Sequence, residues 1–228
     1  TGFSVGQLKG YRTDGLYNYT SEVMNRPYYS FYANKVQKGD IKYIDIDGDG
    51  IIDQNDMVPM GFSSYPEITY GLNFNVNWKG FDLSFLLQGA SNTSIQQRVM
   101  TAWAFNLGAN MTLSEHLNRW SQERFDRGEL ITMPRLSSNG SESPNSQDSD
   151  YWLQNANYLR LKNAEIGYTI NPKMLSKVGI TSLRFYVNGN NLLTFTNLKN
   201  ADPENPTKNT GGIYPQMRVF NVGLNLNF

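Results

Sequence analysis

The sequence predicts an all-β fold, namely an antiparallel transmembrane β-barrel, and three observations support this prediction. Segments in which apolar and polar residues alternate strictly recur along its 228 residues. Their polar positions hold mostly Asn, Thr and Gly, and the connections between them alternate between long and short. Alternation with a period of two gives a strand one apolar and one polar face. Short turns on one rim and long loops on the other are typical of bacterial outer-membrane barrels.

Six strands are expected. The first, over residues 3–12, alternates only weakly, and a long loop over residues 13–65 follows it. The second and third span residues 66–78 and 81–90, and Lys79-Gly80 joins them as a two-residue hairpin turn. Trp78 and Phe81 flank that turn, where an interfacial aromatic girdle is expected.

A second long loop, over residues 91–156, leads to a strand over residues 157–170. Its alternation slips at Lys162-Asn163, which predicts a β-bulge. A short connection then leads to a strand over residues 181–195.

The third long loop, over residues 196–216, precedes a last strand over residues 217–228. We expect the apolar face of the sheet to contact lipid and the Asn-rich face to line a lumen. Six strands cannot close such a barrel, because even small ones need about eight. The residues expected at lipid are Trp78, Phe81, Phe85, Phe185, Val222 and Leu226, and those expected in the lumen are Asn73, Asn75, Asn225 and Asn227.

Composition limits the classes of function. Lys and Arg (20) balance Asp and Glu (20), so no nucleic-acid partner is expected. Mean hydropathy is −0.51, and no apolar run approaches the roughly 18 residues of a membrane-spanning helix. The absence of cysteine excludes disulfides and thiolate metal sites. The chain starts at Thr1 without a signal peptide, so we expect a piece of a longer or processed protein.

One stretch of the first long loop carries a calcium-loop signature. In DIDGDGIIDQND, carboxylates stand at positions one, three, five, nine and twelve, and a glycine stands at position six. Asp56 occupies the position of the usual Glu, and the flanks are too short and too rich in Pro and Gly for two EF-hand helices. An acidic turn without metal is the alternative. The predicted ligands of one structural Ca²⁺ are Asp45, Asp47, Asp49, Asp53 and Asp56 and the carbonyl of Ile51.

The long loops place aromatic residues beside Asn, Gln and Asp. Such surfaces suit stacking on sugars or a protein interface. Small hydrophobic cores that hold large loops together explain such residues equally well. The candidate contacts with substrate or partner are Tyr28, Tyr29, Trp103, Trp120, Trp152 and Tyr214.

No catalytic constellation is evident, and no enzyme is predicted. The only histidine, His116, lies where Thr112 and Glu115 suggest a capping box that opens a short helix with Leu113, Leu117 and Trp120 on one face. No cysteine nucleophile, nucleophile-elbow serine or Gly-rich phosphate loop accompanies it.

Several stretches together resemble the C-terminal part of SusC-like (SusC/RagA family) TonB-dependent outer-membrane transporters of Bacteroidetes. In chain order they are GDIKYIDIDGDGIIDQNDMVPMG, PEITYGLNFNVNWKGFDLSFLLQG, RW with MPRL downstream, YWLQNANYLRLKNAEIGYTI, LRFYVNGNNLLTFTNLKNADPE and YPQMRVFNVGLNLNF.

This resemblance implies that the chain is the last six strands of a roughly 22-stranded barrel with an N-terminal plug. It further implies an outer-membrane location, a SusD-like surface lipoprotein as lid, and import of glycans or peptides energised by the TonB system. Plug and N-terminal strands are absent from this chain, which alone should transport nothing. Phe228 resembles the terminal aromatic by which barrel-assembly machinery selects its clients. The runner-up reading is a soluble, calcium-stabilised β-sandwich that acts as a binding module or adhesin at the cell surface.

Overall fold

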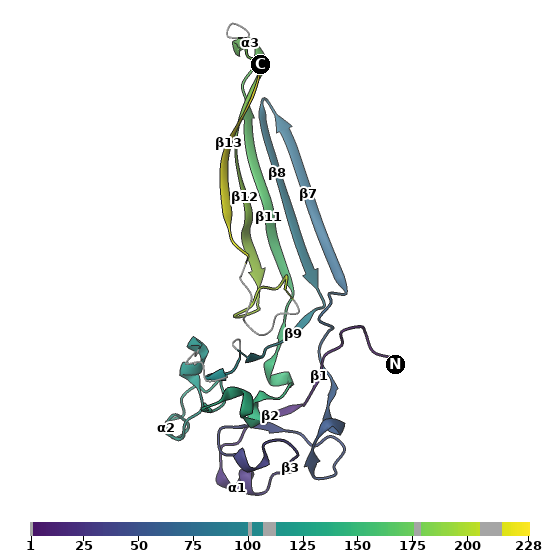
Figure 1. Cartoon of the computed structure of the whole chain (residues 1–228), viewed down its shortest axis with the longest axis vertical. Helices are drawn as coiled ribbons and strands as arrows, with labels where there is room; N and C mark the ends of the chain where they lie inside the picture. Colours follow the sequence, from purple (N-terminus) through teal and green to yellow (C-terminus); the bar gives the residue numbers. More distant parts are fainter. Residues whose placement is uncertain (1, 100–101, 107–112, 176–178, 206–215) are drawn as a thin grey trace. The chain divides into compact units, whose positions relative to one another are not determined.

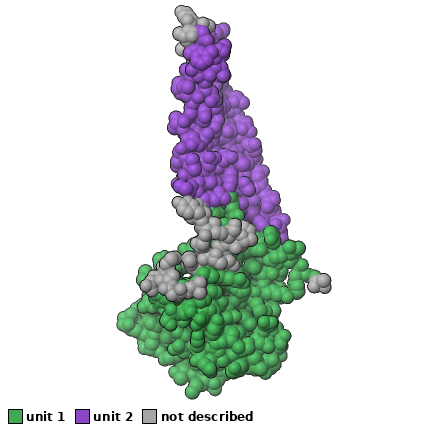
Figure 2. Space-filling model, viewed as in Figure 1, with its two compact units in different colours: residues 1–65, 94–155, 199–213 green, residues 66–93, 156–198, 214–228 purple. Residues whose placement is uncertain are grey.

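The structure, a computed structural model, describes all residues except 1, 100–101, 107–112, 176–178 and 206–215 (Figure 1). The chain divides into two compact units, coloured separately in Figure 2. Unit 1 comprises residues 1–65, 94–155 and 199–213, and unit 2 comprises residues 66–93, 156–198 and 214–228. Each unit is therefore assembled from three separate segments of the chain.

Unit 2 is one antiparallel sheet of five long strands in the order β13-β12-β11-β8-β7 (Figure 1). Strands that follow one another among these five also pair with one another, so the sheet is a meander. The five strands predicted from residue 66 onward are confirmed to within two residues at each end. Their bounds are β7 Ile68–Trp78, β8 Phe81–Ser91, β11 Tyr158–Thr169, β12 Ser182–Thr196 and β13 Val219–Asn227, and a short helix α3, Pro172–Leu175, lies between β11 and β12.

The predicted hairpin turn and the predicted bulge are both present. Lys79 and Gly80 have φ values of 48° and 90°, as a turn that matches the right-handed twist of the flanking strands requires. Trp78 lies opposite Phe81 across this turn. The register of β11 against both of its neighbours shifts between Leu161 and Asn163. Lys162 is the extra residue against β8, whereas against β12 the extra residue lies on β12, between Asn190 and Leu193.

The pairing register gives the sheet one apolar and one polar face. The paired residues Phe74–Phe85, Ile166–Leu83 and Phe185–Leu224 are all apolar and lie on one face. The residues predicted to contact lipid lie on this face, and the residues predicted to line the lumen lie on the opposite one. This apolar face is exposed, as Val222 at 84% shows. In the described part of unit 2 no second sheet covers it, so the soluble sandwich considered above does not fit this structure.

The strand predicted over residues 3–12 is wrong. Within this segment the strand is limited to Lys9–Gly10 (β1), which pairs with Val58–Pro59 (β6) inside unit 1. The N–H of Gln7 donates to the Ser4 carbonyl at 3.0 Å, and Gly6 has a φ of +73°, so a turn interrupts the segment. The described sheet therefore has five strands and not six.

The described helices and strands of unit 1 are short, and apart from β1 they come from the first and second predicted long loops. No helix in the described residues is long and apolar enough to cross a membrane. The further strands are β2 Thr13–Leu16, β3 Tyr28–Tyr29, β4 Ile41–Tyr43, β5 Ile51–Ile52, β9 Ser94–Gln96 and β10 Leu153–Asn155; the helices are α1 Thr20–Met24 and α2 Gln122–Asp126; and 3₁₀ turns cover Ala33–Lys35, Gln54–Asp56, Ser114–Asn118, Gly140–Glu142, Pro144–Ser146 and Asp150–Trp152.

A tyrosine-rich core holds unit 1 together. Tyr29 and Ile41 are completely buried, and the ring centres of Tyr29 and Tyr43 lie 5.6 Å apart. Met133 and Trp152 from the second long loop belong to the same core. The first and second long loops therefore fold as one body around shared apolar side chains, with the aromatic rings in the tilted arrangement that such pairs prefer.

Candidate functional site

The acidic loop of unit 1 brings three of its carboxylates together. Oxygen atoms of Asp45, Asp47 and Asp49 all lie within 4.8 Å of one another, and Asp47 and Asp49 are exposed. The Asp45 carboxylate accepts hydrogen bonds from the N–H groups of Gly48 (2.7 Å) and Gly50 (2.8 Å), both in the positive-φ region that glycine favours. These contacts curl the backbone so that the carboxylates converge.

The other predicted ligands lie elsewhere in the loop. The Asp56 carboxylate is completely buried and accepts from the N–H groups of Ile46 (2.6 Å) and Asp53 (2.9 Å). Asp53 caps the following turn by accepting from the N–H of Asn55 at 2.7 Å. Ile51 pairs with Tyr28 in a short parallel bridge. In this conformation Asp56 pins the two ends of the loop together, and Asp53 and Asp56 are outside the carboxylate cluster.

The neighbouring carboxylates affect the pKa of Asp47. The Asp49 backbone N–H donates to Asp47 and lowers its pKa, but desolvation and the negative charges of Asp49, Asp56 and Asp45 outweigh this, so the pKa of Asp47 is raised above its ordinary value. Like charges at short range favour the protonated form. A bound divalent cation would remove this repulsion.

The predicted aromatic contacts divide into exposed and buried residues. Tyr28 is 61% exposed and can meet a ligand, and Trp103 is half-buried. Tyr214 lies outside the described residues. Tyr29, Trp120 and Trp152 are buried, with at most 8% of their surface exposed, so their assignment as substrate or partner contacts is wrong in this structure.

The buried aromatics instead tie the long loops together. The Tyr29 hydroxyl donates to the Ile41 carbonyl (3.2 Å) and accepts from the N–H of Tyr43 (3.0 Å), and burial raises its pKa. The indole N–H of Trp120 donates to the Asn18 side chain at 3.0 Å, and that of Trp152 donates to the Asn145 carbonyl at 2.8 Å. The alternative of a small core that holds large loops together is therefore confirmed for these residues.

A buried ion pair joins the same loops and was not predicted from sequence. Asp40 is completely buried, and its Oδ1 lies 2.7 Å from the Arg135 Nε. The Asn145 amide donates to the same Asp40 oxygen at 2.9 Å. Burial raises the pKa of Asp40, while Arg135 and the Gln37 N–H act in the opposite direction. Because its partners are about a hundred positions away in sequence, no local pattern could have indicated the contact.

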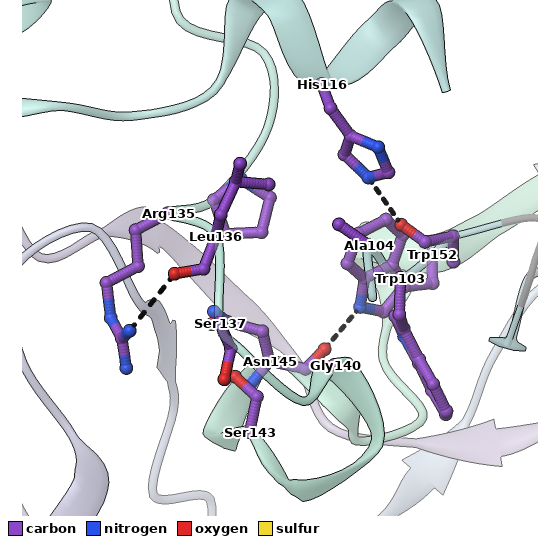
Figure 3. A pocket seen from close by; sticks show the side chains of 12 residues that line it. Trp103, Ala104, His116, Arg135, Leu136, Ser137, Gly140, Ser143, Asn145 and Trp152 are labelled. Carbon is purple, nitrogen blue, oxygen red and sulfur yellow. Dashed lines mark hydrogen bonds between the residues drawn. The ribbon is translucent and has the colours of Figure 1, made fainter. Parts of the chain in front are cut away.

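Arg135 and Asn145 also line a small cavity (Figure 3). Its volume is about 30 Å³, and its walls include Trp103, His116, Arg135 and Trp152. Such a volume holds a water molecule or two. It is too small for a sugar or a peptide residue, so it is a packing defect of the core and not a substrate site.

His116 has a structural role at this cavity. Its Nδ1 accepts from the N–H of Leu113 at 2.9 Å, and its Nε2 lies 3.0 Å from the Ala102 carbonyl, the contact drawn in Figure 3. His116 is buried, whereas Leu117 is 67% exposed, and the segment is a 3₁₀ turn. The predicted apolar stripe is therefore wrong, while Thr112 of the predicted capping box lies outside the described residues.

A larger open groove, of about 720 Å³, lies elsewhere on unit 1. This volume is in the range of small-molecule sites. Phe125 and Tyr151 contribute aromatic walls, and Leu130 is 73% exposed. The sequence signal for it was a pair of apolar residues, Leu130-Ile131, directly after the charged stretch QERFDRGE. The other lining residues are Gly15, Leu16, Asn18, Gly128, Glu129, Ile131 and Thr132.

No protein-family model matches the chain. TonB-dependent receptor P3 of Formosa agariphila is 28% identical over 242 residues, covering 100% of this chain and 22% of the receptor. TonB-dependent receptor SusC of Bacteroides thetaiotaomicron is 26% identical over 192 residues, covering 82% of this chain and 17% of SusC. The chain resembles the C-terminal part of SusC-like TonB-dependent receptors.

Solved structures agree on the fold. A chain of the RagAB peptide importer in its open-open state matches with a TM-score of 0.67 and 21% identity over 97% of this chain and 22% of that one. By its likeness to TonB-dependent receptors the chain is an outer-membrane protein, and the RagAB peptide importer shares its fold. The chain spans about a fifth of the length of the curated relatives it matches.

Proposed function

We propose that the protein containing this chain imports a nutrient across the outer membrane, and that the chain supplies C-terminal strands of the barrel and part of its outer mouth. The observation that carries this proposal is the five-stranded sheet of unit 2, whose apolar face is exposed while its opposite face is polar. An exposed apolar face of this extent needs lipid or a partner. A polar opposite face suits a wet lumen.

The barrel needs strands beyond this chain. In the described sheet β7 and β13 each pair on one side only. An unpaired strand edge in lipid costs several kcal/mol per polar group, so both edges require neighbours. We propose that N-terminal strands of the same receptor complete a barrel of about 22 strands. An N-terminal plug then fills the lumen, and its movement, energised by the TonB system, opens the passage for substrate.

Unit 1 is the proposed contact region for the substrate and for a SusD-like lid lipoprotein. Tyr28 and the groove beside Phe125 and Leu130 offer exposed aromatic and aliphatic surface. Tyr and Phe rings suit stacking on sugars and packing against peptide side chains alike. We therefore propose a glycan or a peptide as the imported substrate.

Uptake by cells tests this function. Labelled oligosaccharides and oligopeptides are offered to cells with and without the full-length gene, and to cells lacking TonB. Import predicts that uptake of one substrate class disappears in both deletion strains and returns when the wild-type gene is supplied. Uptake that survives both deletions contradicts the proposal. The double substitution Tyr28→Ala and Leu130→Ala should weaken uptake, whereas Leu224→Ala on the apolar sheet face should not.

We further propose that the acidic loop holds one Ca²⁺ that stiffens unit 1. The residues present suit a hard cation, since Asp45, Asp47 and Asp49 converge and carboxylate oxygens are its preferred ligands. Closing the site with Asp53, Asp56 and the Ile51 carbonyl requires those groups to turn toward the cluster. No catalytic step depends on the ion.

Limited proteolysis with and without calcium tests the ion. Calcium should slow cleavage near Gly50 in the full-length receptor, because it ties the loop to its carboxylates. The pair Asp47→Asn and Asp49→Asn should abolish this protection, while Asp126→Asn, an exposed acidic residue outside the loop, should retain it. Equal cleavage with and without calcium in the wild-type receptor would support the metal-free acidic turn.

A further inference from the structure

The polar face of the unit 2 sheet carries an ion-pair cluster that spans three strands. The Nε of Arg184, on β12, donates to the Asp82 carboxylate on β8 at 3.0 Å, and its terminal nitrogen contacts the other Asp82 oxygen. The same terminal nitrogen donates to Glu165, on β11, at 2.6 Å. The Arg184 side chain is only 21% exposed. One guanidinium thus binds carboxylates from two other strands.

This contact reaches across a whole strand. Strands β8 and β12 are not neighbours, because β11 pairs with both of them. Two strand spacings amount to about 10 Å, farther than directly opposed side chains reach. The Arg184 guanidinium lies over β11 and stays in place against Tyr186, whose ring centre is 5.0 Å from it.

Gly167 makes the crossing possible. It lies on β11 opposite both Asp82 and Tyr186. A Cβ on residue 167 would lie 2.4 Å from the Arg184 terminal nitrogen and 2.6 Å from an Asp82 carboxylate oxygen. Its φ is not positive, so backbone conformation does not require a glycine here. Space for the ion pair is therefore the reason for glycine.

An interaction such as this ion-pair cluster is needed to fix the register of β8, β11 and β12. A shift of two residues keeps every apolar side chain on the apolar face, so the alternating pattern does not oppose it. The two-residue turn at Lys79-Gly80 sets the register of β7 against β8 only. The connections from β8 to β11 and from β11 to β12, residues 92–157 and 170–181, are too long to do the same. The bulge at Lys162 fixes the strands near the long-loop end, and Asp82 and Arg184 lie toward the opposite end.

We propose that Arg184, Asp82 and Glu165 form a register clamp, which selects one pairing of β8, β11 and β12 during assembly of the sheet. A two-residue slip of either pairing moves Arg184 or Asp82 away from Gly167. Such a slip separates the Arg184 guanidinium from the Asp82 carboxylate and leaves a partly buried charge without its partner. The clamp does not depend on the transported substrate, so it stands independently of the proposed function.

Paired cysteines in the full-length receptor test the clamp, since this chain has no cysteine of its own. Leu83→Cys with Ile166→Cys reports the observed pairing, and Leu83→Cys with Ala164→Cys reports a slip by two residues. The ratio of the two cross-linked products, measured by mass spectrometry, is the readout. Arg184→Met removes all three contacts with Asp82 and Glu165. It should lower the ratio by at least about tenfold, which is the effect of losing a single charge-assisted hydrogen bond.

The controls separate the clamp from general damage. Gly167→Ala should lower the ratio as Arg184→Met does. Gly71→Ala, on the same face of β7 with no atom closer than 3.7 Å to its new Cβ, should leave it unchanged. Asp82→Asn keeps the shape and serves if Arg184→Met does not assemble. An unchanged ratio in Gly167→Ala and Asp82→Asn would overturn the clamp.

Discussion

The two units differ in how far their apolar side chains are exposed. In unit 1, Tyr29, Ile41 and Ile52 are completely buried, as in the interior of a water-soluble domain. In unit 2, Val222 is 84% exposed and Leu224 is 52% exposed on a face that none of the described residues of that unit covers. The first unit is therefore stabilised by the removal of apolar surface from water, and the second needs lipid for its apolar face. One chain is thus adapted to two solvents.

This difference implies that the units lose structure separately. Backbone pairing of the sheet does not run through the core of unit 1, because all partners of the five long strands lie within unit 2. Regions with separate cores can open independently. The following substitutions should damage one unit and leave the other intact.

The largest effect is expected for Tyr29→Ala in the core of unit 1. Loss of this fully buried aromatic side chain, whose hydroxyl contacts Tyr17, Ile41 and Tyr43, should cost about 3–5 kcal/mol. Proteolysis within residues 13–65 should accelerate, while the folded barrel, seen as heat-modifiable migration on a gel, should persist. Tyr28→Ala, at the exposed neighbouring position, is the matched control and should change the rate of this proteolysis little. Simultaneous loss of barrel migration in Tyr29→Ala would show that the units are coupled.

The next effect is expected for Leu224→Lys on the apolar face. A lysine there should destabilise the barrel by about 2–4 kcal/mol if the position lies at the bilayer midplane. Asn225→Lys, one residue farther on the polar face, should be much milder. Heat-modifiability measured against temperature compares the two. Equal losses would mean that the faces have been assigned incorrectly.

Deletion of Phe228 should affect assembly more than stability. This residue is 84% exposed and follows the end of β13, so few contacts within the chain depend on it. We expect less folded receptor in the outer membrane but nearly unchanged melting of the barrel that does assemble. Val222→Ala, on the same strand, is the control for loss of apolar surface. Wild-type amounts of a receptor that melts earlier would assign Phe228 a purely structural role.

The smallest effect concerns pH and helix α1. Glu22 accepts hydrogen bonds from the N–H groups of Tyr19 (2.9 Å) and Asn18 (2.7 Å), and its pKa is lowered, chiefly by the Tyr19 N–H. A lowered pKa means that this contribution is present above the ordinary Glu value of about 4.3 and is lost as pH falls through the lower value.

Hydrogen exchange of the α1 amides, corrected for intrinsic rates, measures this effect. Protection should fall between about pH 6 and about pH 3, on either side of the ordinary Glu value. Glu22→Gln should remove most of the pH dependence, and Glu123→Gln, in α2, should preserve it. The same pH dependence in Glu22→Gln would assign it to another group.

Local pattern alone was enough to predict the sheet of unit 2. Strict alternation, the Lys79-Gly80 turn and the slip at Lys162 are properties of consecutive residues, so they indicated the strands, a hairpin and the bulge correctly. The weak alternation over residues 3–12 misled, because Gly6 and the turn beside it prevent a long strand. Periodicity reports which face a residue occupies and not which distant segment it meets.

Only the tertiary structure could decide which loop residues are buried. Tyr28 and Tyr29 are neighbours with the same side chain, yet one is exposed and the other forms the centre of a core that Met133 and Trp152 complete from far along the chain. Asp40 meets Arg135, and Arg184 crosses Gly167 to Asp82, for the same reason. The amphipathic strands and the acidic loop follow from side chains close in sequence. The shared core, the buried ion pair and the three-strand cluster arise from packing between segments whose proximity no local rule specifies.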